Sequence, residues 1–346
     1  MRDIRHGSLI ASLCAALLAI PLSPQPTRAQ GAQPFYKDKQ VQVVVGTNAG
    51  VGYDLYARLL IAHLGRHIPG EPSFVVRNMI GAGGLRAAEY VARIAPQDGL
   101  SIGSIGRGLP FESMLGQNEI NIDPAKFAWL GSMNREIAVA FSWHTSKVKT
   151  FADLQKTELL TPGTGAGADS EIMPLAFNSL AGARFMLIKG YKGTSEAALA
   201  VERGELDGIA YWSLGSLATL HQHWIDKKLI NILFHTGVGP QAALPGAPSI
   251  RDLTHDGVDR EALDFILARE ALGRPFFTAP ATPTDRVSIL RKGFADAMRD
   301  PDLIKDAALR KLEISLVTGG EVEELLTRAS RAEPATIARV MRALGR

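Results

Sequence analysis

Short runs of β-branched residues alternate along this chain with segments whose apolar residues recur at helical spacing. In the first third, strands are expected at residues 41–46, 73–76 and 101–105, and helices at residues 54–66 and 85–94. Each helix follows a strand and leads to the next one. Alternation of this kind predicts a parallel sheet covered by helices.

The middle of the chain repeats this order of elements. Strands are expected at residues 137–143, 159–161, 185–188, 209–212 and 230–234, and helices at residues 169–180 and from 194 to about 203. We interpret these five strands as one second sheet. No short repeat period is present, only two sheet-forming halves of similar plan.

The C-terminal third is interpreted as a return to the first sheet. Residues 237–248 are rich in proline and glycine and end the second half, while residues 265–272 and 276–278 are expected to rejoin the first sheet. The tail after residue 284 is helical in pattern. Two halves joined by chain crossings predict an α/β protein with a ligand cleft where strand-end loops converge.

Two glycine-containing loops, residues 46–54 and 162–168, each lie between a strand and a helix. The first backbone N–H groups of a helix have no intrahelical partners, and the helix dipole adds partial positive charge there. Small residues let a ligand approach these donors closely. The pattern therefore predicts that the protein holds a small negatively charged molecule.

The N-terminus has the layout of a secretory signal peptide. Arg2, Arg5 and His6 precede an apolar run over residues 9–20, which is followed by three prolines and small residues before Ala29. The apolar run is too short to span a bilayer comfortably. We expect residues 1–29 to be removed and the mature protein to be exported.

Composition limits the chemistry of the mature chain. Cleavage would remove the only cysteine, Cys14, so neither disulfides nor thiolate metal sites are expected. The leader carries three arginines and one aspartate, so its loss lowers the net charge from +3 to +1. A nearly neutral protein gives no support to nucleic-acid binding.

Several segments, in a shared order, resemble one protein family. They are Ala49, Gly50 and Asp54 (family pattern P-F-P-A-G-G-x-x-D), residues 77–84 (E-N-R-P-G-A-G-G), 95–99 (A-x-P-D-G, with one residue added here), 191–198 (Y-K-G-x-x-x-A), 204–207 (G-x-V-D) and 277–283 (F-A-P-A-G-T-P). Over nearly all of the mature chain the sequence resembles the periplasmic solute-binding proteins of tripartite tricarboxylate transporters, the TctC or Bug group.

The resemblance implies a periplasmic-binding-protein-like α/β fold of type II, whose two lobes close on a ligand in the cleft between them. We expect lobe 1 at residues 35–135 plus 241–346, and lobe 2 at residues 136–240. The ligand implied is a small carboxylate, which a monomeric periplasmic protein delivers to the membrane permease subunits of the transporter. No cofactor, metal or nucleic acid is implied.

The expected ligand-binding residues lie in the two loops and at nearby strand ends. They are Thr47, Asn48, Ala49, Gly50, Val51, Gly52, Tyr53, Arg107, Thr164, Gly165, Ala166, Gly167, Ala168, Tyr211 and Trp212. The loops would act largely through backbone N–H groups and bridging water. Asp54 is expected to orient the first loop as a helix N-cap, since its carboxylate would repel an anion.

Two departures from the family pattern concern ligand choice. Thr47 and Asn48 stand where the family has prolines, and Tyr211 and Trp212 stand where many relatives have Asp-Asn. In those relatives the aspartate can serve the amino group of an amino-acid ligand. Tyrosine and tryptophan offer flat apolar surface with a polar edge instead. We therefore expect a carboxylate with an apolar or aromatic body, not an amino acid.

Some residues leave two interpretations open. Arg107 follows a predicted strand and could pair with a second ligand carboxylate or lie at the surface. His63 and His67 have the i, i+4 spacing of a zinc pair, but no third ligand is evident, and a solvated helix face is favoured. His221 and His223 are expected to diverge on a helix.

Two other classes of function were weighed against transport. A sensor that passes its closed state to a membrane histidine kinase uses the same fold, and the sequence does not separate the two. An exported α/β enzyme is disfavoured, since no nucleotide-binding glycine pattern, nucleophile elbow or H-E-x-x-H motif is complete.

Overall fold

A computed structural model describes residues 33–50, 52–81, 84–115, 122–165, 168–191 and 193–346. The elements discussed below belong to one compact unit, Pro34–Arg346. The predicted leader and its cleavage site lie outside the described residues. Within the described part of the chain, no helix has both the length and the apolar character needed to cross a membrane.

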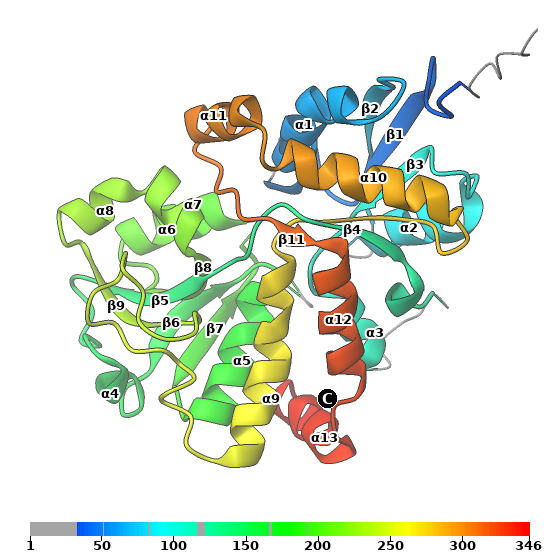
Figure 1. Cartoon of the computed structure of the whole chain (residues 1–346). Helices are drawn as coiled ribbons and strands as arrows, with labels where there is room; N and C mark the ends of the chain where they lie inside the picture. Colours follow the sequence, from blue (N-terminus) through cyan, green and yellow to red (C-terminus); the bar gives the residue numbers. More distant parts are fainter. Residues whose placement is uncertain (1–32, 51, 82–83, 116–121, 166–167, 192) are drawn as a thin grey trace, which may run out of the picture. The chain divides into compact units, whose positions relative to one another are not determined.

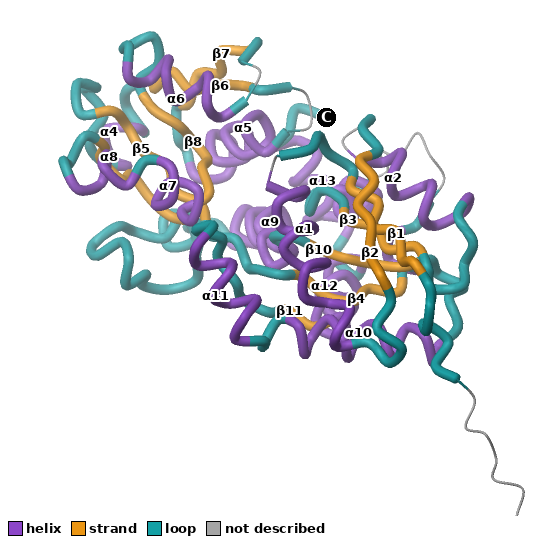
Figure 2. The backbone as a smooth tube through the Cα atoms, turned by 90° about the horizontal axis from the view of Figure 1, so that it is seen from above, coloured by secondary structure: helices purple, strands orange, loops and turns teal. Residues whose placement is uncertain are grey.

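The larger sheet has six strands in the order β11-β4-β10-β3-β1-β2 (Figure 2). Its strands are β1 (Gln40–Val45), β2 (Ser73–Asn78), β3 (Ser101–Ser104), β4 (Ala128–Ser132), β10 (Pro275–Thr278) and β11 (Val317–Thr318). The strands β1, β2 and β3 are parallel, as the alternating pattern predicts. However, β10 runs antiparallel to both of its neighbours, β3 and β4, so the sheet is mixed.

Several helices and short helical turns connect or follow the strands of this sheet along the chain. They are α1 (Gly52–Leu64), α2 (Leu85–Glu89) with the π-helical turn η3 (Tyr90–Ile94), α3 (Leu109–Met114), α10 (Thr284–Ala297), α11 (Pro301–Leu309) and α12 (Gly319–Ser330), with the short 3-10 turns η1 (Gly65–His67) and η4 (Pro124–Lys126). Strand β1 lies between β3 and β2, and its residues Val43, Val44 and Val45 are fully buried. Burial on both faces explains why this strand is an unbroken β-branched run.

The second half has two small sheets instead of the single sheet expected. Strand β5 (Ala138–Trp143) pairs antiparallel with β8 (Gly208–Ser213) and β9 (Ile230–His235), and β6 (Leu159–Gly163) pairs in parallel with β7 (Phe185–Lys189). Side chains replace ladder bonds where β6 meets β8: the Ala210 N–H donates to Thr161 Oγ1 (2.9 Å) and the Leu160 N–H to the Asp207 carboxylate (3.0 Å). Pro162 in β6 has no N–H to donate, which also prevents a continuous ladder.

The helices of this half are α4 (Phe151–Leu154), α5 (Asp169–Ala181), α6 (Thr194–Glu202), α7 (Leu214–Leu220) and α8 (Gln222–Asp226). The sequence explains both ends of α5. Asp169 and Glu171 lie in its first turn, where the helix dipole favours negative charge. Gly182 ends it in the left-handed region at φ 71°, which glycine adopts without strain.

Residues 265–272 do not form a strand of the first sheet. They are the end of α9 (Gly257–Leu267) and the 3-10 helix η5 (Ala268–Leu272), whereas Phe276, Phe277 and Thr278 do enter the sheet as β10. The buried residues of α9 recur at helical spacing, with Ala262, Leu263 and Ile266 on one face.

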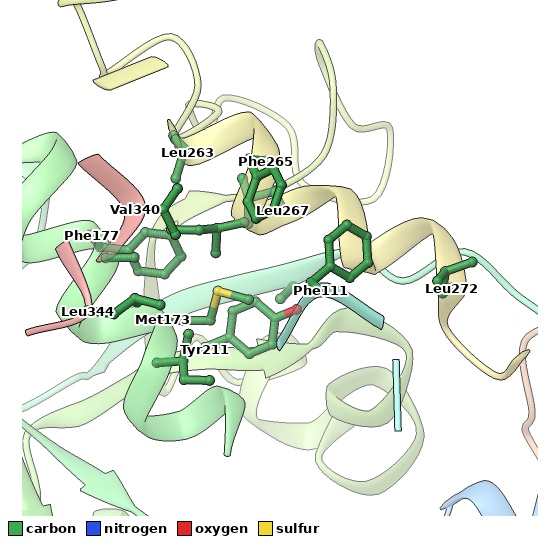
Figure 3. Close-up of a cluster of buried hydrophobic side chains, with 14 of the residues drawn as sticks. Phe111, Met173, Phe177, Tyr211, Leu263, Phe265, Leu267, Leu272, Val340 and Leu344 are labelled. Carbon is green, nitrogen blue, oxygen red and sulfur yellow. The ribbon is translucent and has the colours of Figure 1, made fainter. Parts of the chain in front are cut away.

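A continuous hydrophobic cluster joins sections that lie far apart in the sequence. Helices α9 and α13 (Pro334–Ala343), from the last third, pack against α5 from the middle (Figure 1). Figure 3 shows Leu263 of α9 and Val340 of α13 beside Phe177 of α5. The division into two lobes stays a prediction, and these contacts place α9 and α13 next to the middle section.

Candidate functional site

A cavity of about 830 Å³ lies where several strand ends and helix N-termini meet. Its wall contains eight of the expected ligand-binding residues: Gly50, Gly52, Tyr53, Arg107, Thr164, Ala168, Tyr211 and Trp212. Thr47, Asn48, Ala49 and Gly165 are described but are not part of the wall. Val51, Ala166 and Gly167 lie outside the described residues.

Three helices begin at this cavity. The wall contains the first residues of α1 (Gly52 and Tyr53), of α5 (Asp169 and Ser170, preceded by Ala168) and of α6 (Thr194 and Ser195, preceded by Gly193). The N-caps of α5 and α6, Ala168 and Gly193, provide no side-chain cap. Converging helix N-termini favour negative charge in the space between them.

Side chains occupy some of the loop amides that the sequence assigned to the ligand. The Gly50 N–H donates to Asp54 Oδ2 (2.8 Å), the Thr164 N–H to Ser170 Oγ (3.1 Å) and the Gly165 N–H to Glu171 Oε1 (3.0 Å). In each case the acceptor belongs to the first turns of the following helix. The expectation that these particular donors are unpaired is therefore wrong for this structure.

Asp54 holds the first loop in place. Besides Gly50, its carboxylate accepts hydrogen bonds from Arg58 Nε (2.8 Å) and Asn78 Nδ2 (2.9 Å), and Asn78 also donates to the Thr47 carbonyl (2.9 Å). Burial alone would raise the pKa of Asp54, but the bonds from Arg58, Gly50 and Asn78 lower it. Asp54 thus connects the loop to α1 and β2 as an anion. It does so from the third residue of α1 and not from the N-cap position that the sequence suggested.

Arg107 lies at the centre of a buried ionic network. Its Nη1 donates to Glu136 Oε2 (2.9 Å), and its Nη2 donates to Asp169 Oδ2 (2.6 Å) and to the Tyr211 hydroxyl (3.1 Å). Its backbone N–H donates to the Tyr53 hydroxyl (3.0 Å). The guanidinium expected to meet a ligand or the surface is therefore buried and bonded to protein acceptors from several segments.

Arg274 is a second cation in the wall, and no sequence motif marks it. Its Nη1 donates to Glu136 Oε2 (2.9 Å), and its guanidinium lies over the rings of Tyr53 (4.8 Å to the centroid) and Tyr56 (5.0 Å). Its Nε has no hydrogen-bond partner among the described residues. Arg274 therefore has one carboxylate partner where Arg107 has two.

The pKa values of the acidic groups in and beside the network are shifted in opposite directions. Burial would raise the pKa values of Glu136 and Asp169, but Arg107 and the neighbouring arginines lower both. Burial raises the pKa of Glu270 to about 7, because a hydrogen bond from Thr236 and the charge of Arg107 offset it only in part. Glu270 accepts a hydrogen bond from the Tyr211 hydroxyl (3.0 Å).

The two aromatic residues near the end of β8, Tyr211 and Trp212, pack against other buried side chains. Trp212 is 3% exposed and lies against Phe141 and Trp224, each with ring centroids 6.0 Å away. Tyr211 extends into the hydrophobic cluster beside Met173 (Figure 3). Its hydroxyl is used by Arg107 and Glu270, so Tyr211 carries no negative charge toward the cavity.

Several wall residues were not anticipated from the sequence. They are Leu55, Tyr56, Asn134, Glu136, Asp169, Ser170, Gly193, Thr194, Ser195, Ser213, Gly215, Ser216, Thr219, Leu220, Arg274, Arg310, Lys311, Leu312 and Glu313. The segment before α6 contains glycines, as the two predicted ligand loops do, and this signal could have placed residues 193–195 at the cavity. Nothing local marks Arg274 or residues 310–313, because they reach the cavity from the C-terminal third.

The wall carries more basic than acidic side chains. Arg107, Arg274, Arg310 and Lys311 are basic, and Glu136, Asp169 and Glu313 are acidic. Burial, together with the charge of Glu136, raises the pKa of Glu313. The electrostatic balance of the cavity, added to the helix N-termini, favours an anionic occupant.

The sequence matches no protein-family model and no curated protein. Solved structures give a clear likeness. A TctC solute-binding protein from Polaromonas aligns with 89% of this chain and 99% of its own at a TM-score of 0.67 and 15% identity. MatC from Rhodopseudomonas palustris, solved with bound malate, covers 88% of this chain and 99% of its own (TM-score 0.63, 18% identity).

A further similar structure is Rpa4515 from R. palustris, solved with adipate, at a TM-score of 0.64 and 21% identity over 89% of this chain and 97% of its own. At these identities the likeness establishes the fold. The chain has the mixed α/β fold of TctC-type and related periplasmic solute-binding proteins, as the sequence predicts.

Proposed function

We propose that this protein is an exported solute-binding protein of the TctC or Bug group that captures a small carboxylate. The observation that carries this proposal is the cavity itself, where three helices begin and basic side chains outnumber acidic ones. Two proteins of similar fold were solved with malate and adipate, both of which are di-acids. No covalent step is part of the proposal.

Arg274 is the cation we assign to the ligand carboxylate. It lies in the cavity wall and is paired with one carboxylate, Glu136, whereas the donors of Arg107 are bonded to Glu136, Asp169 and Tyr211. A charged hydrogen bond to a ligand carboxylate is worth about 1.5–3 kcal/mol. The N-termini of α1, α5 and α6 add dipolar stabilisation to the same anion.

The body of the ligand is proposed to be apolar or aromatic. An amino acid needs an acceptor for its ammonium group, and the hydroxyl of Tyr211 is already bonded to Arg107 and Glu270. Trp212 is one of the wall residues, and a tryptophan there suits an apolar ligand body better than an ammonium group. These features favour benzoate-type acids over acidic amino acids.

Capture is followed by closure of the two predicted lobes around the ligand and delivery to a membrane permease. Closure is favoured when a ligand contacts both lobes, because the closed state alone gains both sets of bonds. Tyr53 and Arg274 fall within the section predicted as lobe 1, and Thr194 and Trp212 within the section predicted as lobe 2. A single ligand in the cavity would meet residues of both sections.

Calorimetric titration of the purified protein with benzoate, adipate and glutamate tests this proposal. We expect benzoate to bind most tightly and to be recovered unchanged. Trp212→Leu should lower the affinity for benzoate roughly tenfold, whereas Trp143→Leu, a buried tryptophan outside the cavity, should not. Tightest binding of glutamate would contradict the ligand class, and turnover of any acid would contradict a binding role.

A further inference from the structure

Outside the carboxylate cavity, three potential metal ligands converge on one spot. They are Glu202 at the end of α6, His221 between α7 and α8, and His223 in α8. Each offers one ligand atom, and these three atoms all lie within 4.8 Å of one another. In the part of the chain that the structure describes, no other group of three histidine, cysteine or acidic side chains meets this condition.

We propose that Glu202, His221 and His223 bind a divalent transition-metal ion such as Zn²⁺. Two imidazoles and one carboxylate are ligands that zinc accepts, and three protein ligands leave a position for water. The sequence suggests two histidines that diverge on one helix, but His221 lies at φ −135°, where α7 ends and α8 begins. This break allows both histidines to approach the carboxylate of Glu202.

Small side-chain movements would complete the geometry. Tetrahedral zinc with ligand bonds of about 2.0–2.1 Å needs ligand atoms roughly 3.3–3.5 Å apart. The His223 Nε2 and Glu202 Oε1 atoms are 4.0 Å apart, and their side chains are 52% and 37% exposed. Exposed side chains change rotamer at little cost, so contraction of this pair does not require backbone movement.

Two tryptophans contact His221, the third proposed metal ligand, and one of them bonds to the carboxylate of Glu202. The His221 ring lies 4.0 Å from Trp224 and edge-on to Trp212 at 5.4 Å, and its Nδ1 is buried without a hydrogen-bond partner among the described residues. The indole N–H of Trp224 donates to Glu202 Oε1 (2.9 Å). Hydrogen bonds of this kind orient metal ligands from outside the coordination sphere.

The histidines His63 and His67 provide a contrast. His63 and His67 have the spacing of a zinc-binding pair, but His63 Nε2 contacts Asp306 (3.2 Å) and His67 Nε2 contacts Asp300 (2.7 Å). Arg66 also pairs with Asp300 and places a positive charge beside this group. These histidines contact carboxylates at the start of α11 and within it, and give a matched control.

Titration of tag-free protein with Zn²⁺ by calorimetry tests the site. We expect one ion per chain and a loss of affinity of at least tenfold in His223→Ala and in Glu202→Gln, with unchanged far-ultraviolet circular dichroism. The double variant His63→Ala/His67→Ala should bind Zn²⁺ as the parent does. Absence of binding, or binding that only the His63/His67 variant removes, would overturn the proposal.

A second measurement locates the ion independently. Cu²⁺ quenches the fluorescence of nearby indoles, and Trp212 and Trp224 both contact His221. Saturable quenching by Cu²⁺ that Zn²⁺ reverses, and that His223→Ala weakens at least tenfold, would support the site. Quenching that His223→Ala leaves unchanged would place the ion elsewhere and contradict it.

Discussion

The two arginines of the cavity wall share a carboxylate but have different surroundings. Arg107 is bonded to Glu136, Asp169 and Tyr211, while Arg274 is bonded to Glu136 and stacked over Tyr53 and Tyr56. A buried cation with complete partners stabilises the protein around it, because removing it leaves buried charges uncompensated. A cation with fewer protein acceptors retains capacity for a ligand. From this comparison we expect Arg107 to matter most for stability and Arg274 to matter most for ligand binding.

The largest expected effect is that of Arg107→Met on stability. Asp169 would lose its closest cation and Glu136 one of its two, so we expect the free energy of unfolding to fall by about 3–5 kcal/mol. Urea denaturation at pH 7 measures this loss. Arg310→Met is the control, because Arg310 is 45% exposed in an i, i+4 pair with Asp306 and should cost less than about 0.5 kcal/mol. Equal losses of unfolding free energy in the two variants would contradict a special structural role for Arg107.

Glu270, which accepts a hydrogen bond from Tyr211 in the network around Arg107, should make the stability of the protein depend on pH. Its pKa is about 7 in the folded protein and near the ordinary 4.5 in the unfolded chain, so the folded state binds the proton more tightly. Between pH 4.5 and 7 its contribution therefore lowers the free energy of unfolding as pH rises, by about 3 kcal/mol in total.

Glu270→Gln keeps the acceptor for Tyr211 and removes this titration. Urea denaturation of both proteins at pH 5, 6, 7 and 8 should show the parent losing stability relative to the variant as pH rises, with no further relative loss once Glu270 is ionised. A constant difference across the range would mean that Glu270 titrates normally.

Arg274→Gln tests the binding side of the comparison. We expect the affinity for the preferred carboxylate to fall roughly tenfold to a hundredfold, as the loss of one charged hydrogen bond requires. Stability should fall less than in Arg107→Met, since Glu136 keeps Arg107. Calorimetric titration and urea denaturation separate the two quantities. An affinity within twofold of the parent would contradict the proposed pairing of Arg274 with the ligand carboxylate.

The smallest effect is expected at the first loop, next to Tyr53. Asp54→Asn weakens the bonds from Gly50 and Arg58, and should lower the free energy of unfolding by about 1 kcal/mol and the ligand affinity a few-fold. Arg58→Gln keeps the Gly50 bond, so its effect on affinity should be smaller. The opposite order would mean that Asp54 acts through Arg58 and not through the loop.

Local sequence patterns identified most strands and helices but did not show which strands pair with one another. The run at β1 predicted a buried strand because valines on both faces require cover. Gly50, Gly52 and Tyr53, from the loop before α1 and its first turn, lie in the cavity wall. The second half was wrongly joined into one sheet. Pro162 and the Asp207 carboxylate interrupt the ladder, and a strand pattern carries no information about its neighbours.

The sequence by itself determined the class of fold and most of the strands and long helices, because hydrophobic period and glycine position act over a few residues. Only the tertiary structure decided that Arg107 is enclosed by Glu136 and Asp169, that Arg274 reaches the cavity, and that Glu202 meets His221 and His223. These pairings join residues from 19 to more than 100 positions apart in the chain. Packing of whole elements, which no local pattern encodes, brings such side chains together.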